Sequence, residues 1–152
     1  AVEQLQIKSG KKSSATQLGE WFANLAQKSS WLSNFRFDAD IPLVRAYSNY
    51  LMDAVVDGYE STCGHHHRIS IQSCFDNREA IGTNLLKFEI ASKKYSKNDD
   101  YVALGILICA SRDTKKWLKL DNSVGTLEEY EVAIRTAYKN IINCRIYQIE
   151  II

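Results

Sequence analysis

The chain has 152 residues, of which 45% are hydrophobic and 24% are charged, and its formal net charge is +1. We expect one globular domain over residues 1–152 that buries about two-thirds of the surface of its unfolded chain. The longest apolar runs fall far short of the ~18 residues that suggest a membrane span, which argues against a membrane partner. A charge so close to zero provides no overall attraction to nucleic acid, although clustered lysines permit a local phosphate-binding face.

Cysteine usage and the first residues predict the cellular setting. The four cysteines are widely spaced and form no CxxC pair, whereas disulfide frameworks belong to small secreted chains. The first residues, AVEQLQIKSGKK, lack the apolar core of a signal peptide. We therefore expect reduced thiols in a cytoplasmic protein, and the missing initiator methionine indicates a processed, trimmed or fragmentary chain.

The first half of the chain contains one clear helix. In SSATQLGEWFANLAQKSSWL, hydroxyl side chains can cap a helix, and apolar residues then recur at helical spacing until about Ser29. Pro42 is expected to start a short helix. AVVDGY is expected to form a short strand that ends on an Asp-Gly turn, with Asp57 at its end.

The second half alternates strands with helices. A strand is predicted from about Arg68 to Phe75, a helix over 79–95, and a strand buried on both faces over 101–110. Thr126 and Glu129 form a capping-box signature for the last helix, which precedes a final strand, RIYQIEII. The expected buried stripe of that helix is Leu127, Tyr130, Ile134, Ala137 and Ile141. This order predicts an α/β fold, with a central mixed sheet flanked by helices.

Three consecutive histidines, His65, His66 and His67, precede the predicted strand at Arg68. Neighbouring residues of a strand point to opposite faces, so three in a row cannot ligate one ion there. In a loop, His65 and His67 could bind zinc with Cys63, but no second ligand pair stands at the spacing typical of zinc sites. A histidine-rich turn that contacts phosphate or solvent is the favoured interpretation.

A second constellation combines Asp57 with one polar face of the next strand, Ser70, Gln72 and Cys74. Metal-dependent phosphodiester cleavage needs carboxylates close together at a sheet edge, where they bind Mg²⁺. An aspartate that ends one strand, followed by alternate polar positions on the next, predicts that geometry. The pattern alone is weak, because aspartate before glycine is common in turns.

The surrounding sequence strengthens this interpretation. IQSCFDNREAIGTNLLKFEIASKKY, DDYVALGILI and GTLEEYEVAIRTAYKNIINCRIYQIEI follow one another in an order that resembles the BglII/BstYI group of type II restriction endonucleases. That group belongs to the PD-(D/E)XK nuclease superfamily, and the resemblance extends from about residue 15 to residue 152. Its weight comes from the order of the elements, since none of the motifs is highly specific.

The resemblance implies a restriction-endonuclease-like fold and a role for each residue of the constellation. Asp57 stands where the family has its metal-binding aspartate, Gln72 where it has the catalytic glutamate, and Cys74 where it has a second polar residue. A register slipped by two residues would place Ser70 at the glutamate position, so the second carboxylate is absent in either case. The loop between Asp57 and the strand is also longer than the family usually has.

Three explanations of Gln72 remain open. The protein is a catalytically inactive DNA binder, or an engineered glutamate-to-glutamine variant, or it obtains a carboxylate from elsewhere, such as Glu79 or Glu89. The resemblance implies Mg²⁺ if the protein is active, double-stranded DNA as the partner, and a homodimer on a palindromic site. The candidate DNA-binding residues are Asn77, Arg78, Asn84, Lys93, Lys94 and Lys97. The alternative function is a non-catalytic nucleic-acid-binding or protein-interaction domain on the same fold.

Overall fold

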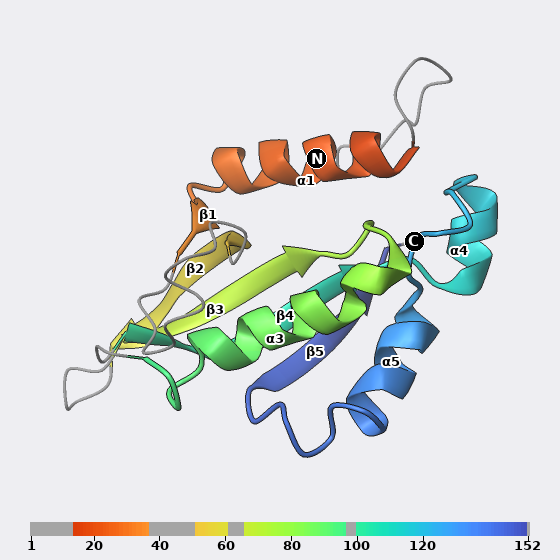
Figure 1. The fold of residues 1–152 in the computed structure, drawn as a ribbon. Coiled ribbons are helices and arrows are strands. Elements are labelled where there is room, and N and C mark those ends of the chain that lie inside the picture. The colour runs from red at the N-terminus through yellow and green to blue at the C-terminus, as the bar shows by residue number, and fades with distance from the viewer. Residues whose placement is uncertain (1–13, 37–50, 61–65, 97–99, 152) are drawn as a thin grey trace.

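The computed structural model describes residues 14–36, 51–60, 66–96 and 100–151. The five strands are β1 (Leu32–Phe35), β2 (Met52–Glu60), β3 (His66–Ser73), β4 (Asp100–Cys109) and β5 (Arg145–Glu150). The helices are α1 (Ser14–Lys28), the 3-10 helix η1 (Arg78–Ala80), α3 (Ile81–Ala91), α4 (Arg112–Trp117) and α5 (Leu127–Arg135). Figure 1 shows α1 on one side of the sheet and α3 with α5 on the other.

The strands form one mixed sheet in the order β1-β2-β3-β4-β5. β1 and β2, and β2 and β3, pair antiparallel, whereas β3, β4 and β5 run parallel. The parallel strands are joined by crossovers, through α3 and then through α4 and α5. Because of these directions, β2 begins where β3, β4 and β5 end. We call this side the carboxyl end of the sheet, and the opposite side its amino end.

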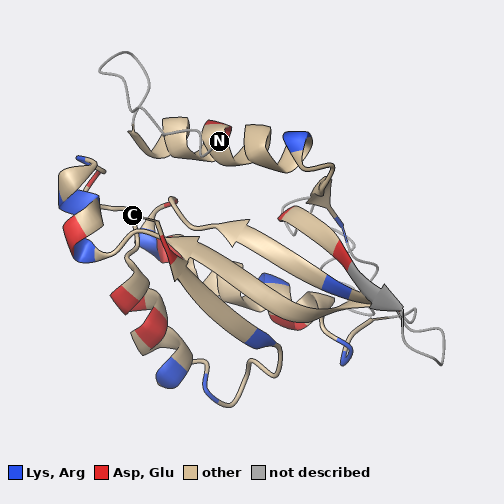
Figure 2. Ribbon diagram, turned by 180° about the vertical axis from the view of Figure 1, so that it is seen from behind, with Lys and Arg blue, Asp and Glu red and all other residues tan. Residues whose placement is uncertain are grey.

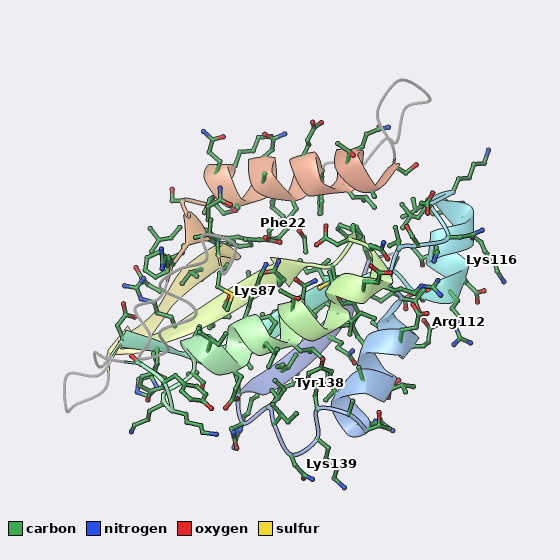
Figure 3. The ribbon with its side chains drawn as sticks, viewed as in Figure 1. Phe22, Lys87, Arg112, Lys116, Tyr138 and Lys139 are labelled. Carbon is green, nitrogen blue, oxygen red and sulfur yellow. The ribbon has the colours of Figure 1, made fainter. Side chains whose placement is uncertain are left out.

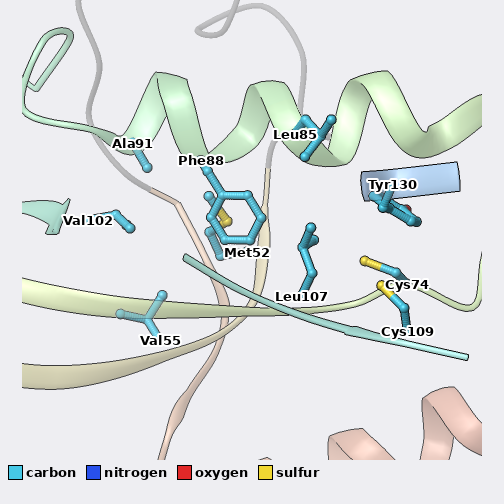
Figure 4. Close-up of a cluster of buried hydrophobic side chains, with 10 residues drawn as sticks. All are labelled: Met52, Val55, Cys74, Leu85, Phe88, Ala91, Val102, Leu107, Cys109 and Tyr130. Carbon is cyan, nitrogen blue, oxygen red and sulfur yellow. The ribbon is translucent and has the colours of Figure 1, made fainter. Parts of the chain in front are cut away.

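A hydrophobic core fills each face of the sheet. Under α3 and α5, the fully buried Leu85, Phe88 and Tyr130 pack on Leu107 and its neighbours (Figure 4). On the other face, α1 buries Phe22 and Ala26 against Ala54 of β2 and Ile71 of β3. The α/β class and the flanked mixed sheet are therefore confirmed.

The predicted helices and strands differ from the structure mainly at their ends. The capping box of α5 is present: the N–H of Glu129 donates to the Thr126 hydroxyl, and the N–H of Thr126 donates to the Glu129 carboxylate. The helix ends at Arg135, however, so Ala137 and Ile141 are exposed and the second half of the expected stripe is wrong.

Two short elements, β1 and α4, were not predicted, and one turn was placed wrongly. The Asp-Gly turn at Asp57 does not form, because β2 continues through this position to Glu60. The short helix expected at Pro42 lies outside the described residues. No helix within the described ranges has the length and apolar character needed to cross a membrane.

β5 forms one edge of the sheet among the described strands. Its side chains alternate, and those pointing away from α5 are uncovered: Tyr147 is 62% exposed and Ile149 is 48% exposed. The opposite edge is β1, which has only four residues. In β1, Asn34 has a left-handed backbone (φ 51°) and is skipped in the pairing with β2.

Candidate functional site

The structure separates Asp57 from Gln72. In the antiparallel pairing of β2 with β3, Asp57 lies opposite Arg68, and its side chain is 77% exposed. Asp57 forms an ion pair with Arg68, with 3.6 Å between Oδ1 and Nε. Gln72 lies four residues further along β3, which is about 13 Å at the rise of a strand. The expected metal site shared by Asp57 and Gln72 is therefore wrong in its geometry.

The polar face of β3 is buried rather than open to a ligand. Ser70, Gln72 and Cys74 are all at most 1% exposed, and Cys74 belongs to the core beneath α3. Burial raises the pKa of the Cys74 thiol well above its usual value, and the neighbouring Cys109 raises it further. A neutral, buried thiol is a poor metal ligand, because metal binding requires the thiolate. The expected catalytic position of Cys74 is therefore wrong as well.

The opposite face of β3 opens into a cleft at the carboxyl end of the sheet. The cleft has a volume of about 400 Å³ and lies between α1, β1, the start of β2 and the end of β3. Its polar lining residues are Thr16, Ser33, Asn34, Asp53, Ser73 and Asp76. In open α/β sheets, ligands bind outside the carboxyl ends of the parallel strands, which is where this cleft lies.

Asp53 is the best-fixed carboxylate of the cleft. Its Oδ2 accepts a hydrogen bond from the backbone N–H of Ser73 at 2.8 Å and a second from the Ser73 hydroxyl at 2.7 Å. The backbone N–H of Asp53 lies 3.4 Å from Oε1 of Gln72, to which it donates. Both bonds from Ser73 end on Oδ2, so neither occupies Oδ1. Asp53 is thus held in one orientation, and Ser73 leaves its Oδ1 available to a ligand.

Asp76 is the second carboxylate of the cleft. Partial burial of its carboxyl group raises its pKa, and the negative charge of Asp53 raises it further. The positive charge of Lys87 and a hydrogen bond from Asn84 lower the pKa in part. Two carboxylates that repel one another across a cleft favour a cation between them.

The donors of the cleft suit Mg²⁺ better than zinc, because its two charged side chains are carboxylates. Mg²⁺ binds through one or two carboxylates and keeps several of its waters, which suits Asp53 and Asp76. Within the described ranges, no three histidine, cysteine, aspartate or glutamate side chains come close enough to hold a metal between them. Two residues of the zinc site considered from the sequence, Cys63 and His65, lie outside those ranges.

The other acidic candidates do not reach the cleft. Glu79 lies in η1, is exposed and is not among the cleft-lining residues. Glu89 is 3% exposed and accepts hydrogen bonds from the N–H of Asn143, the Asn143 side chain and the N–H of Cys144. Glu89 therefore fixes the loop before β5, and Asp76 is the second carboxylate of the candidate site.

The candidate DNA-binding residues are distributed over three places. Asn77 and Arg78 follow Asp76 at the carboxyl end, where Arg78 donates to the backbone oxygen of Asn122. Asn84 is 2% exposed and donates to the hydroxyl of Tyr130, so its expected contact with DNA is wrong. The remaining described candidates, Lys93 and Lys94, lie at the amino end, and Lys97 lies outside the described residues.

Sequence reasoning missed Asp53, Ser73 and Asp76. Asp53 stands inside an apolar stretch, YLMDAVV. A charged residue at such a position is the sequence feature that could have identified Asp53 as a site residue. Asp76 comes directly after the predicted strand, which ends at about Phe75, and directly before the candidate residue Asn77.

The comparisons with known proteins assign no relative. A scan against protein-family models finds no match, and a search of curated proteins finds no significantly similar sequence. The function must therefore be argued from the site itself.

Proposed function

We propose that this chain is a DNA-binding protein of the PD-(D/E)XK class that hydrolyses phosphodiester bonds with Mg²⁺ in the cleft of Asp53 and Asp76. The observation that carries the proposal is the double hydrogen bond from Ser73 to Oδ2 of Asp53, which fixes one carboxylate in a cleft that a second carboxylate also lines. The proposal keeps the family suggested by the sequence and moves the metal site from Asp57 to Asp53.

The arrangement of the elements supports this class. The order in the family is a core strand, a polar residue pair, a helix, a buried strand, a long helix and a last strand. Here β3, the pair Asp76 and Asn77, α3, β4, α5 and β5 follow in that order. The candidate site lies where the first of these strands ends, with Asp53 on β2 and Asp76 in the segment after β3. Carboxylates brought together in this way are what metal-dependent phosphodiester cleavage requires.

Each residue of the site has a distinct task in the proposed reaction. Asp53 would hold the metal, and the two donors of Ser73 keep its carboxylate oriented. When bound there, Mg²⁺ would supply a water of lowered pKa and neutralise charge on the phosphate. Asp76, the second carboxylate of the cleft, would complete the metal site together with Asp53.

Exposed cations beside the cleft support phosphate binding. Arg112 and Lys116 project from α4 into solvent (Figure 3), and Lys119 follows the helix. The loop after α4 packs against the wall of the cleft, since Leu120 lies in one core cluster with Leu18 and Phe75. Such side chains supply affinity for the backbone without reading sequence. The proposal includes a homodimer on a palindromic duplex, because a two-fold protein matches a two-fold site.

The decisive experiment compares two aspartates of β2. Supercoiled plasmid is incubated with the wild-type chain, Asp53→Asn and Asp57→Asn, with Mg²⁺ and with EDTA. We expect Mg²⁺-dependent nicking by the wild type and by Asp57→Asn, and its loss in Asp53→Asn. Nicking that survives Asp53→Asn but is lost in Asp57→Asn would refute the proposed site.

A second candidate function is DNA binding without cleavage. It is favoured by the composition of the cleft, in which the described lining residues include no lysine or arginine to assist the reaction. In that case all three proteins shift a labelled duplex in a gel with steep salt dependence, and none of them nicks it. Absence of both binding and nicking would leave the protein-interaction alternative.

A further inference from the structure

A second pocket lies at the amino end of the sheet, away from the cleft. It has a volume of about 290 Å³. Its lining residues with polar or charged side chains are His67, Ser92, Lys93, Lys94, Tyr101, Asn143, Cys144 and Arg145. His67 stands six residues before Ser73 on β3, so the pocket and the cleft are about 20 Å apart along the strand.

The charge of this pocket is one-sided. Lys93, Lys94 and Arg145 line it, and its described lining residues include no carboxylate. None of the ion pairs among the described residues involves these three cations. Figure 2 shows basic residues at the turn after α3 and at the start of β5, the two segments that supply them. The pocket therefore carries three cationic side chains that form no ion pair within the described part of the chain.

Aromatic contacts fix the wall of the pocket. Nζ of Lys93 lies 5.7 Å from the centre of the Tyr101 ring, a cation–π contact. Tyr101 is only 8% exposed, and its ring meets that of His67 edge-on with 5.1 Å between the centroids. The Tyr101 hydroxyl also lies 3.3 Å from Nδ1 of His67. The last histidine of the run at 65–67 is thus part of the pocket wall.

The loop that carries Arg145 is anchored from behind. Both oxygens of the Glu89 carboxylate are used by Asn143, and Oε2 also accepts from the N–H of Cys144. Burial and the charge of Glu89 raise the pKa of the Cys144 thiol to about 12, which keeps this thiol neutral. A neutral thiol is a poor nucleophile, so the pocket is suited to bind an anion and not to react with it.

We propose that the pocket of His67, Lys93, Lys94 and Arg145 binds a phosphate group. Two lysines and an arginine among the lining residues of one small cavity match the charge and the hydrogen-bond acceptors of a phosphate. The phosphate belongs to a small phosphate ester or to a nucleic-acid backbone, which share this chemistry. The proposal is independent of the Asp53 cleft.

Amide-resolved NMR titrations of the full chain test this site. The probes are inorganic phosphate, adenosine monophosphate and a short duplex, each against sodium chloride at equal ionic strength. The variants are Lys93→Gln/Lys94→Gln and, as a matched control, the exposed pair Lys28→Gln/Lys139→Gln, which has no part in either proposed site. Asp53→Asn is included because it removes the proposed metal site without touching this pocket.

We expect a phosphate-bearing probe to shift the amides of Lys93, Lys94, Asn143 and Arg145 in the wild type. The dissociation constant should rise about tenfold or more in Lys93→Gln/Lys94→Gln, since hydrogen bonds to charged groups are lost. It should stay unchanged in the control pair Lys28→Gln/Lys139→Gln and, for inorganic phosphate, in Asp53→Asn. A response to adenosine monophosphate identifies a small ester as ligand, and a response to the duplex alone identifies the backbone.

Three results would overturn the proposal. In the first, none of the three probes shifts these amides. In the second, sodium chloride shifts them equally, so that the pocket attracts any anion. In the third, the two double variants lose affinity to the same extent, so that general surface charge is responsible. Loss of plasmid nicking in Asp53→Asn with intact phosphate binding would separate the two sites.

Discussion

Ser73 donates to Asp53 twice, from its backbone N–H and from its hydroxyl, and both hydrogen bonds end on Oδ2. The pair joins the end of β3 to the start of β2 at the floor of the cleft. The backbone donor is kept whatever side chain stands at position 73, whereas the hydroxyl can be removed by mutation. The orientation of the carboxylate can therefore be loosened without removing its charge.

Ser73→Ala should weaken the proposed Mg²⁺ site while leaving the fold intact. We expect the Mg²⁺ concentration needed for half-maximal nicking to rise about tenfold or more, as is typical when a residue that orients a metal ligand is lost. Titration of plasmid nicking with Mg²⁺ measures this. The control is Ser70→Ala on the same strand, whose buried hydroxyl has no hydrogen-bond partner among the described residues. If both variants keep wild-type Mg²⁺ dependence, the hydroxyl of Ser73 has no part in metal binding.

The raised pKa of Asp76 should make stability depend on pH in a definite direction. The folded state binds this proton more tightly than the unfolded state, so the stabilisation is complete below the unfolded pKa and is lost as the pH rises through the folded pKa. Asp76→Asn should abolish the part of the pH dependence that Asp76 contributes. It should change the free energy of unfolding at pH 7 by less than about 1 kcal/mol, because solvent screens the group. Urea unfolding from pH 3 to pH 7 measures it. An identical pH profile in the variant would contradict the assignment.

Glu89→Gln should destabilise the protein markedly. An amide donor would replace one of the two acceptor oxygens that face Asn143, and the charge on the remaining bonds would be lost. We expect a loss of about 2 kcal/mol in the free energy of unfolding, the range for charged hydrogen bonds. Glu79→Gln, an exposed change on η1, serves as the control and should stay within about 0.5 kcal/mol. Equal losses in both would show that Glu89 does not anchor the loop.

Gly105 and Gly19 should respond to alanine in opposite ways. A Cβ at Gly105 would lie 2.6 Å from Cδ1 of the fully buried Phe88, so we expect overpacking to cost about 1–3 kcal/mol. A Cβ at Gly19 would meet no atom of the described residues within 4 Å, and in α1 alanine should stabilise by about 0.5–1 kcal/mol. Thermal unfolding of the two variants provides the comparison. A stabilised Gly105→Ala would mean that α3 packs less closely on β4 than described.

The sequence predicts the elements well where a local signal defines them. The capping box at Thr126 and the uncharged run of β4 identify their elements correctly. β1 escapes prediction because four residues with a left-handed Asn34 show no regular alternation. α4 has only six residues, too few for a helical period to be recognised.

The candidate site was harder to predict because it depends on strand register. Asp57 and Asp53 lie on the same strand, and only the pairing with β3 decides which of them lies near the end that carries Ser73. The choice of face was a second difficulty. Alternation shows that Gln72 and Ser73 point to opposite faces, but not which face is covered by α3. The choice of Asp57 over Asp53 and the choice of the wrong face of β3 have the same cause. Both features are set by tertiary structure and leave no local signal in the sequence.

The two edges of the described sheet differ in their capacity to recruit another strand. β1 is short and interrupted at Asn34, whereas β5 is regular and exposes Tyr147 and Ile149. Charged residues stand at both ends of β5, Arg145 first and Glu150 last. Charges on an edge strand discourage edge-to-edge aggregation. Arg145 would then hinder edge-to-edge pairing of β5 with another chain, in addition to lining the pocket of His67, Lys93 and Lys94.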